Sequence, residues 1–245
     1  LTVRKVTGPQ VRPGELRPSP DLTLTLLRMG FPMALQNAIS AIGSMVVQFV
    51  INGYGMLFLA GFTATNKLYG LLEIAATSYG FAVTSYVGQN LGARLVNRIK
   101  RGQRAAAVVA FLTSVVIAAA MLLFGRLVLG LFISGEPAEV EASLDIAYHY
   151  LSIMSVCLPI LYMLHIYRSA LMGLGDTVVP MLSGFAEMVV RIGVALLLPL
   201  VMGQEGIYYA EVGAWTAAAI LLVAAYYARM RALSRRKGFA LDEKN

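Results

Sequence analysis

Charged residues are scarce in this sequence, and cysteine and histidine are scarcer still. Asp, Glu, Lys and Arg make up 13% of the chain, against about a quarter of an average soluble domain. A charged side chain at the centre of a bilayer costs roughly 2.5–3.5 kcal/mol, so a membrane environment selects against charge. One cysteine excludes an intrachain disulfide, and two histidines are too few for a metal cluster. The composition therefore favours a membrane protein without a metal centre.

Motifs for catalysis and nucleotide binding are also missing. The sequence contains no GxSxG, HExxH, P-loop or CxxC pattern. We therefore expect no enzymatic activity and no cofactor. Because no ATP site is present in the sequence, any transport would be driven by an ion gradient or would run downhill.

Apolar residues, in contrast, are abundant. They make up 58% of the chain, and the mean hydropathy is +0.70. A membrane-spanning helix needs about 20 mostly apolar residues. Six runs are long enough, at residues 29–53, 58–87, 103–125, 144–172, 177–202 and 207–230. We predict an all-α membrane protein with a six-helix transmembrane domain over residues 25–230, preceded by a linker at 1–24 and followed by a basic tail at 231–245.

The positive charges alternate from one end of the runs to the other. Lysine and arginine gather in residues 4–28, 94–104 and 229–244, whereas the third and fifth loops carry mostly glutamates, among them Glu205 and Glu211. The positive-inside rule then places both ends of the chain and the even loops in the cytoplasm of a plasma membrane, which we take to be a bacterial inner membrane. Because apolar runs separate the basic clusters, we expect contacts with membrane lipids and none with nucleic acid.

Polar residues follow one face of several apolar runs. Such residues usually face a bundle interior or a water-filled cavity, and hydrogen bonds between helices are the alternative. Both interpretations remain open at this point. The candidates for lining a cavity are Asn37, Ser40, Ser44 and Gln48 in the first run, Asn66, Tyr69 and Thr77 in the second, and Tyr162 in the fourth.

Charged residues inside the runs are the next candidates. Glu73 lies in the middle of the second run without a partner on its own face, so it is a candidate for binding a cation or exchanging a proton, or for pairing with a basic residue of another helix. Glu187 and Arg191 are spaced i, i+4, which favours a structural pair within one helix. We expect Arg168 to extend toward the lipid headgroups, and His165 to make a hydrogen bond between helices or to relay protons.

Aromatic residues near the start of the last run suggest a further assignment. Trp215 and the Tyr208–Tyr209 pair fit an aromatic belt at the outer membrane interface.

Three motifs, in the same order and spacing, support a family resemblance. They are "GFPMALQNAISAIGSMVVQFVINGYG" at residues 30–55, "SYVGQNLGAR" at 85–94 and "YRSALMGLGDTVVPM" at 167–181. Together they resemble the repeat of the multidrug and toxic compound extrusion (MATE) transporters, over residues 22–230. The resemblance implies twelve helices in two six-helix lobes, of which this chain matches the C-terminal lobe.

The resemblance also implies a function. It predicts export of small amphipathic or cationic substrates in exchange for sodium ions or protons, by alternating access, with an N-terminal six-helix lobe on the same or a separate chain as partner. A transient sodium site is implied, but its residues are unknown. Some branches of the family carry carboxylates where this chain has Ser40 and where it has Ile160, Leu161 and Tyr162. Glu73 is therefore the local candidate for ion or proton coupling.

Two alternatives to the antiporter remain. A lipid-linked oligosaccharide flippase of the same superfamily would be expected to carry more basic residues facing its cavity. A non-transporting half-transporter or scaffold would need a second copy or a partner to complete it.

Overall fold

Long helices account for nearly all of the structure. The computed structural model describes residues 19–235, so the linker predicted at 1–24 and the tail predicted at 231–245 lie mostly outside the described residues. No strand occurs within 19–235, which confirms the all-α prediction. The helices are α1 (Pro20–Asn52), α2 (Met56–Gly92), α3 (Val96–Leu129), α4 (Pro137–Gly173), α5 (Val178–Leu197), α6 (Pro199–Met202), the 3-10 helix η2 (Gly203–Tyr208) and α7 (Tyr209–Ser234).

Proline and glycine set the helix boundaries. α1 and α4 begin at Pro20 and Pro137, where the missing N–H would have no partner inside the helix. Gly55, with φ +91°, precedes α2, and Gly175, with φ +78°, follows α4. These backbone conformations favour glycine because it has no Cβ.

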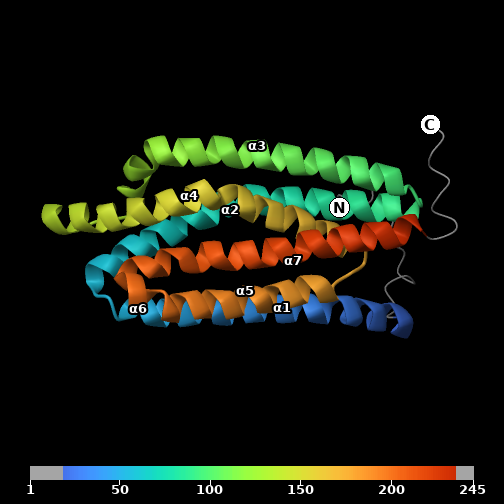
Figure 1. The fold of residues 1–245 in the computed structure, drawn as a ribbon, viewed down its shortest axis with the longest axis horizontal. Helices are drawn as coiled ribbons and strands as arrows, with labels where there is room; N and C mark the ends of the chain where they lie inside the picture. The colour runs from blue at the N-terminus through green and yellow to red at the C-terminus, as the bar shows by residue number, and fades with distance from the viewer. Residues whose placement is uncertain (1–18, 236–245) are drawn as a thin grey trace, which may run out of the picture.

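The helices form two groups that run along the long axis of the molecule (Figure 1). α2, α3 and α4 pack together, and α5 packs against both α1 and α7. α7 also packs against α4 and joins the two groups, whereas α1 and α2 barely touch, although they are neighbours in the sequence. A polar face of α1 and a polar face of α2 are therefore left apart from each other.

A glycine and a hydroxyl group close the α2–α4 contact. A Cβ on Gly61 would lie 2.6 Å from the carbonyl oxygen of Ser143, so only glycine lets the two backbones approach this closely. One turn further along, Thr65 Oγ1 donates a hydrogen bond to the carbonyl oxygen of Ala147, at 2.9 Å. Small residues and short hydroxyl side chains thus hold α2 against α4.

The aromatic belt predicted at the start of the last run is wrong for two of its three members. Trp215 and Tyr208 are each 2% exposed, while Tyr209 is 38% exposed. The indole of Trp215 stacks on the ring of Tyr69, with 5.4 Å between centroids, and Tyr208 stacks on Tyr150. Because α7 packs against α4 and α5, the rings of Trp215 and Tyr208 stack inside the bundle instead of contacting lipid headgroups.

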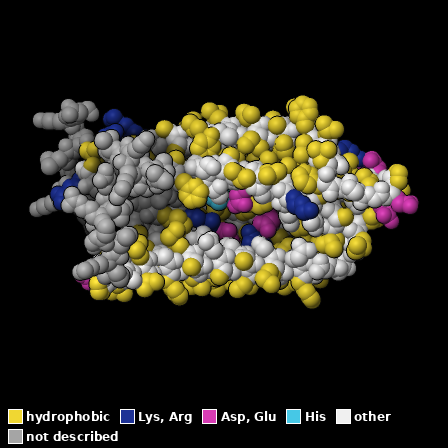
Figure 2. All heavy atoms as spheres, turned by 180° about the vertical axis from the view of Figure 1, so that it is seen from behind, with side chains coloured by type: hydrophobic (Ala, Val, Ile, Leu, Met, Phe, Trp, Pro, Cys, Tyr) yellow, Lys and Arg dark blue, Asp and Glu magenta, His cyan; other side chains and the backbone are white. Residues whose placement is uncertain are grey.

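The surface has the properties of a membrane protein. Hydrophobic side chains cover most of the face in Figure 2, and large ones such as Phe49 and Val116 are 79% and 68% exposed. Exposed basic residues, including Arg94 and Arg101, lie where α2 ends and α3 begins, whereas exposed Glu139 lies at the opposite end, where α4 begins (Figure 1). This separation of charge agrees with the alternation expected from the sequence.

The number of membrane spans stays a prediction. Each of the six predicted runs overlaps one long helix. Four segments within residues 19–235 are long and apolar enough to cross a membrane, namely Pro20–Asn52, Val96–Leu129, Pro137–Gly173 and Val178–Ser234. α2, which carries Lys67 and Glu73, is not among them. The run predicted at 177–202 is interrupted, because α5 ends at Leu197 and Pro199 starts the four-residue helix α6.

Candidate functional site

A cavity of about 390 Å³ lies where α1 and α2 stay apart. α4, α5 and α7 complete its walls. Seen from behind, acidic, basic and histidine side chains gather in the middle of a largely hydrophobic face (Figure 2). The residues that line the cavity are Gln36, Asn37, Ser40, Ala41 and Ser44 of α1, Tyr69, Glu73 and Thr77 of α2, Leu161, Leu164, His165 and Arg168 of α4, Glu187 and Arg191 of α5, and Glu211 and Trp215 of α7.

Six of the nine residues predicted to line a cavity or to couple an ion meet at this cavity. Helical geometry explains why, because residues three or four apart lie on the same face of a helix. Their contact with a substrate or an ion stays a prediction. They are Asn37, Ser40 and Ser44 of α1 and Tyr69, Glu73 and Thr77 of α2.

Three other candidates do not line the cavity. The ring of Tyr162 is fully buried, and its hydroxyl donates to the carbonyl oxygen of Leu72 at 3.0 Å, so it connects α4 to α2. Gln48 is exposed and donates from its amide nitrogen to Asn52 Oδ1, at 3.1 Å. Asn66 is half-buried on α2 outside the lining residues. Hydrogen bonding between helices, the alternative left open by the sequence, therefore applies to Tyr162.

Glu73 has a partner on another helix. The Nε2 atom of His165 lies 3.2 Å from Glu73 Oε1, which connects α4 to α2 across the cavity. The Glu73 side chain is 34% exposed and that of His165 is 13% exposed. Because an imidazole is charged only when it is protonated, this pair can be an ion pair or a neutral-donor hydrogen bond to the carboxylate. The carboxylate is exposed to the cavity in either state.

Arg168 turns into the bundle, so its expected extension toward the headgroups is wrong. The guanidinium is 13% exposed and forms an ion pair with Glu187 of α5, which is 7% exposed. Ser183 Oγ lies 3.3 Å from the same guanidinium nitrogen. With its amide oxygen oriented toward the guanidinium, Gln36 accepts a hydrogen bond from Arg168 Nε at 3.1 Å. A nearby carboxylate stabilises a buried guanidinium more than a distant headgroup does.

The predicted pairing of Glu187 with Arg191 within one helix is also wrong. Glu187 pairs with Arg168, and Arg191 pairs with Glu211, at 2.8 Å between Arg191 Nη2 and Glu211 Oε2. Glu211 lies in the first turn of α7 and is 14% exposed, so it belongs to the cavity wall rather than to the outer loop in which the sequence placed it. Glu187 and Arg191 are correctly spaced for one face of α5, but each forms its ion pair with a residue of another helix. These partners are Arg168 of α4 and Glu211 of α7.

Sequence reasoning did not assign four polar or aromatic residues to the cavity wall, which are Gln36, Arg168, Glu211 and Trp215. Helical spacing in the sequence could have indicated two of them, Arg168 and Trp215. Arg168 follows His165 by three residues, and Trp215 follows Glu211 by four, so each pair shares a helix face. Glu211 already lay within the run predicted at 207–230, and the structure places it in the first turn of α7.

The charges of the cavity do not cancel completely. Glu73, Glu187 and Glu211 supply three carboxylates, whereas Arg168 and Arg191 supply two permanent cations. With His165 neutral, the wall carries one unmatched negative charge. Among the described residues no group of three or more histidine, cysteine, aspartate or glutamate side chains is arranged to hold a metal ion. The arrangement can attract a single cation or accept a proton.

Comparisons with known proteins agree with the fold and the motifs. The MatE family model matches residues 32–197. Probable multidrug resistance protein YpnP of Bacillus subtilis (strain 168) is 36% identical over 67 residues, which are 27% of this chain and 15% of that protein.

Two solved structures share the fold at low sequence identity. One is an outward-facing conformation of a multidrug resistance MATE family transporter of the MOP superfamily, with a TM-score of 0.83 and 20% identity, covering 93% of this chain and 51% of that chain. The other is a MOP superfamily transporter from Pyrococcus furiosus, for which a reverse polarity of the binding pocket is said to suggest a different function. It has a TM-score of 0.87 and 20% identity, covering 96% of this chain and 52% of that chain.

The matches cover different shares of the proteins compared. The chain spans about half the length of the solved transporters, and the matched region spans 15% of YpnP. The family model covers more than half of the chain and includes the helices that carry most of the cavity wall. This chain therefore belongs to the MatE family of multi-pass membrane transporters.

Proposed function

We propose that the chain forms one lobe, the C-terminal one, of a secondary active transporter that exports small amphipathic or cationic compounds in exchange for sodium ions or protons. The observation that carries this proposal is a partly exposed carboxylate, Glu73, which lines a cavity in an otherwise hydrophobic bundle and whose ion-pair partner is a histidine instead of an arginine. Such a cavity favours a cationic substrate or a coupling cation and disfavours anions.

Glu73 is the group of the cavity wall best suited to couple an ion to transport. Its side chain is 34% exposed, whereas those of Glu187 and Glu211 are 7% and 14% exposed. The two buried carboxylates are paired with arginines, which keep their charge at every physiological pH. The partner of Glu73 is a histidine, so the charge on Glu73 is the least firmly compensated of the three.

Alternating access follows if the two orientations of the transporter differ in how much they expose Glu73. A proton or sodium ion then favours the orientation in which it binds more tightly. In secondary transporters built from repeats, the lobes rock around a central site. An N-terminal six-helix lobe, on the same or a separate chain, would face the α1–α2 side of this cavity. We place the assembly in a bacterial inner membrane, with both ends of this segment in the cytoplasm.

The two alternatives receive less support from the geometry. A flippase for a pyrophosphate-linked sugar needs cations that are available to the ligand. Both arginines of this cavity are already paired with glutamates. A scaffold would have no use for a partly open charged cavity, since buried charges are expensive to maintain.

Substitution of Glu73 tests the proposal. Glu73→Gln keeps the size and the hydrogen-bonding capacity of the side chain and removes its titration. In proteoliposomes that contain this lobe together with its N-terminal lobe, we expect ion-coupled efflux to fall by about 100-fold or more, by analogy with the contribution of a positioned proton-transfer group. Sodium and proton gradients are imposed separately, so that the gradient that drives wild-type efflux identifies the coupling ion.

Glu139→Gln is the matched control. Glu139 is exposed at the start of α4, far from the cavity wall, and its substitution should leave transport unchanged. Full ion-coupled transport by the Glu73→Gln variant would remove Glu73 from the mechanism. A wild-type preference for anionic substrates would overturn the proposal as a whole.

A further inference from the structure

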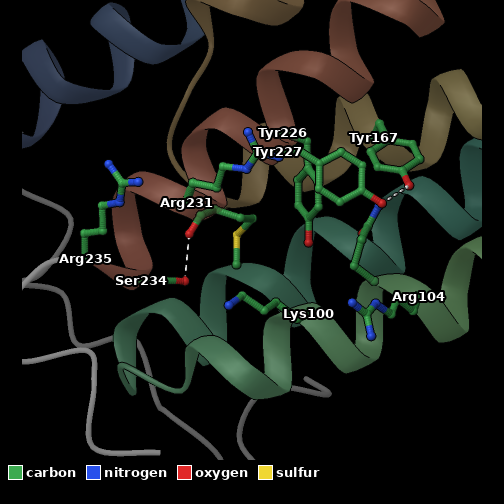
Figure 3. Close-up of a pocket in the computed structure, with 10 residues that line it drawn as sticks. Lys100, Arg104, Tyr167, Tyr226, Tyr227, Arg231, Ser234 and Arg235 are labelled. Carbon is green, nitrogen blue, oxygen red and sulfur yellow. Dashed lines mark hydrogen bonds between the residues drawn. The ribbon is translucent and has the colours of Figure 1, made fainter.

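A second cavity lies at one end of the molecule, where α3 begins and α7 ends (Figure 3). Its volume is about 350 Å³, and it shares no lining residue with the cavity between α1 and α2. In Figure 3, Tyr226 and Tyr227 of α7, Tyr167 of α4, and Lys100 and Arg104 of α3 surround the same space. The remaining lining residues are Gln103, Met230, Arg231, Ser234 and Arg235.

The wall of this cavity is basic and lacks carboxylates. Four cationic side chains line it, from Lys100, Arg104, Arg231 and Arg235, and none of its ten described lining residues is acidic. None of the four forms an ion pair with a residue in the range 19–235. In the first cavity each arginine has a glutamate, so the second cavity offers positive charge that the described part of the protein does not neutralise.

Two buried polar side chains in the wall have no hydrogen-bond partner among residues 19–235. Gln103 is 2% exposed, and neither its amide nitrogen nor its amide oxygen is bonded. Tyr226 is 3% exposed, and its hydroxyl is also unbonded. A buried polar group without a partner is destabilising. Both residues line the cavity, so a polar ligand beside them could supply partners that the described residues do not.

An apolar pocket adjoins the basic cavity. Its volume is about 340 Å³, it lies between α2 and α3, and Gln103 lines both spaces. A ligand that fills both would need a charged group joined to an apolar part. The residues that line this apolar pocket are Tyr79, Ala82, Val83, Tyr86, Gly102, Gln103 and Ala106.

We propose that the basic cavity binds the phosphate headgroup of an anionic phospholipid, with part of an acyl chain in the adjoining apolar pocket. The cavity lies at the end of the helices where basic residues and tyrosines gather, which is the composition of a membrane interface. Guanidinium, ammonium and hydroxyl donors match the oxygens of a phosphodiester, and basic pockets between helices at this level suit anionic headgroups. This site goes beyond the proposed antiport and does not depend on it.

Lipid retention by the full chain tests the site. The chain is purified in detergent, mixed with phosphatidylglycerol or phosphatidylcholine, and examined by native mass spectrometry. We expect tighter retention of phosphatidylglycerol, and a drop of about fivefold on Arg104→Gln, since one basic residue at an anionic surface contributes on the order of 1 kcal/mol. Arg101→Gln is the matched control, because Arg101 is exposed on the same helix and does not line the cavity.

Further variants separate binding from folding. Arg231→Gln removes a charge from α7 instead of α3 and should reproduce the loss, whereas Arg104→Lys keeps the charge and should retain most of the lipid. Equal losses in Arg101→Gln and Arg104→Gln would show diffuse surface attraction and overturn the proposal. Displacement of phosphatidylglycerol by millimolar inorganic phosphate would also overturn it, in favour of a site for free phosphate.

Discussion

The two long sides of α2 are built differently. The side that faces α4 is closed by Gly61, by the hydrogen bond of Thr65 to Ala147, and by the hydroxyl of Tyr162. The side that lines the cavity stays apart from α1 and carries Glu73, whose partner His165 reaches it from α4 across the cavity. Backbones approach where side chains are small or make short neutral hydrogen bonds, and they stay apart where charged side chains need room and water. One helix thus serves both a rigid interface and a hydrated site.

The open side owes its stability to pairs of opposite charge. Arg168 with Glu187 and Arg191 with Glu211 connect α5 to α4 and to α7. A buried charge without its partner is expensive, whereas the exposed pairs of Arg126 with Glu141 and Asp145 sit in water at the ends of α3 and α4. The same type of interaction should therefore matter greatly in the cavity and little at the end of the bundle.

The largest predicted effect comes from Glu211→Gln, which removes the ion-pair partner of the buried Arg191 guanidinium. We expect a loss of about 3–5 kcal/mol in the free energy of unfolding, measured in detergent by thermal or denaturant unfolding. The double variant Arg191→Gln/Glu211→Gln removes both charges and should recover part of this loss. If the double variant is no more stable than the single variant, the pair is not coupled and the open side is held by other contacts.

A smaller effect is predicted on the closed side of α2. Gly61→Ala would place a Cβ 2.6 Å from the carbonyl oxygen of Ser143, a backbone atom that cannot move aside. We expect a loss of about 1–3 kcal/mol in the free energy of unfolding. Gly70→Ala is the control on the same helix, because its Cβ would meet no atom within 4 Å, and it should be neutral or stabilising by up to about 1 kcal/mol. Equal behaviour of the two variants would show that α2 and α4 are not closely packed at Gly61.

The smallest effect is expected for Arg126→Gln at the end of α3. The arginine side chain is 41% exposed, and those of its partners Glu141 and Asp145 are 66% and 63% exposed. Water and salt compensate most of such a pair, so the unfolding midpoint should not change measurably. If Arg126→Gln lowered the stability as much as Glu211→Gln, ion pairs in the cavity and at the exposed end of the bundle would not differ in their contribution.

Much of the fold was predictable from local pattern. The all-helical class and the approximate position of each long helix follow from the apolar runs, and six polar candidates do line one cavity. The errors concern side chains whose best partners lie far away in the sequence, such as Arg168 and Glu211. Periodicity identifies the face of a helix on which a residue lies, but not which neighbouring helix that face meets.

The sequence by itself determined the helical class, the charge asymmetry between the two ends and the polar faces of α1 and α2. These features are local, because a backbone in lipid must satisfy its own hydrogen bonds and a helix repeats every 3.6 residues. Only the tertiary structure decided that Glu73 meets His165, 92 residues away, and that each cavity arginine pairs with a glutamate of another helix. Such pairings depend on how the helices pack, because a charged side chain pairs with the opposite charge that lies nearest to it in the folded structure. That partner need not be near it in the sequence.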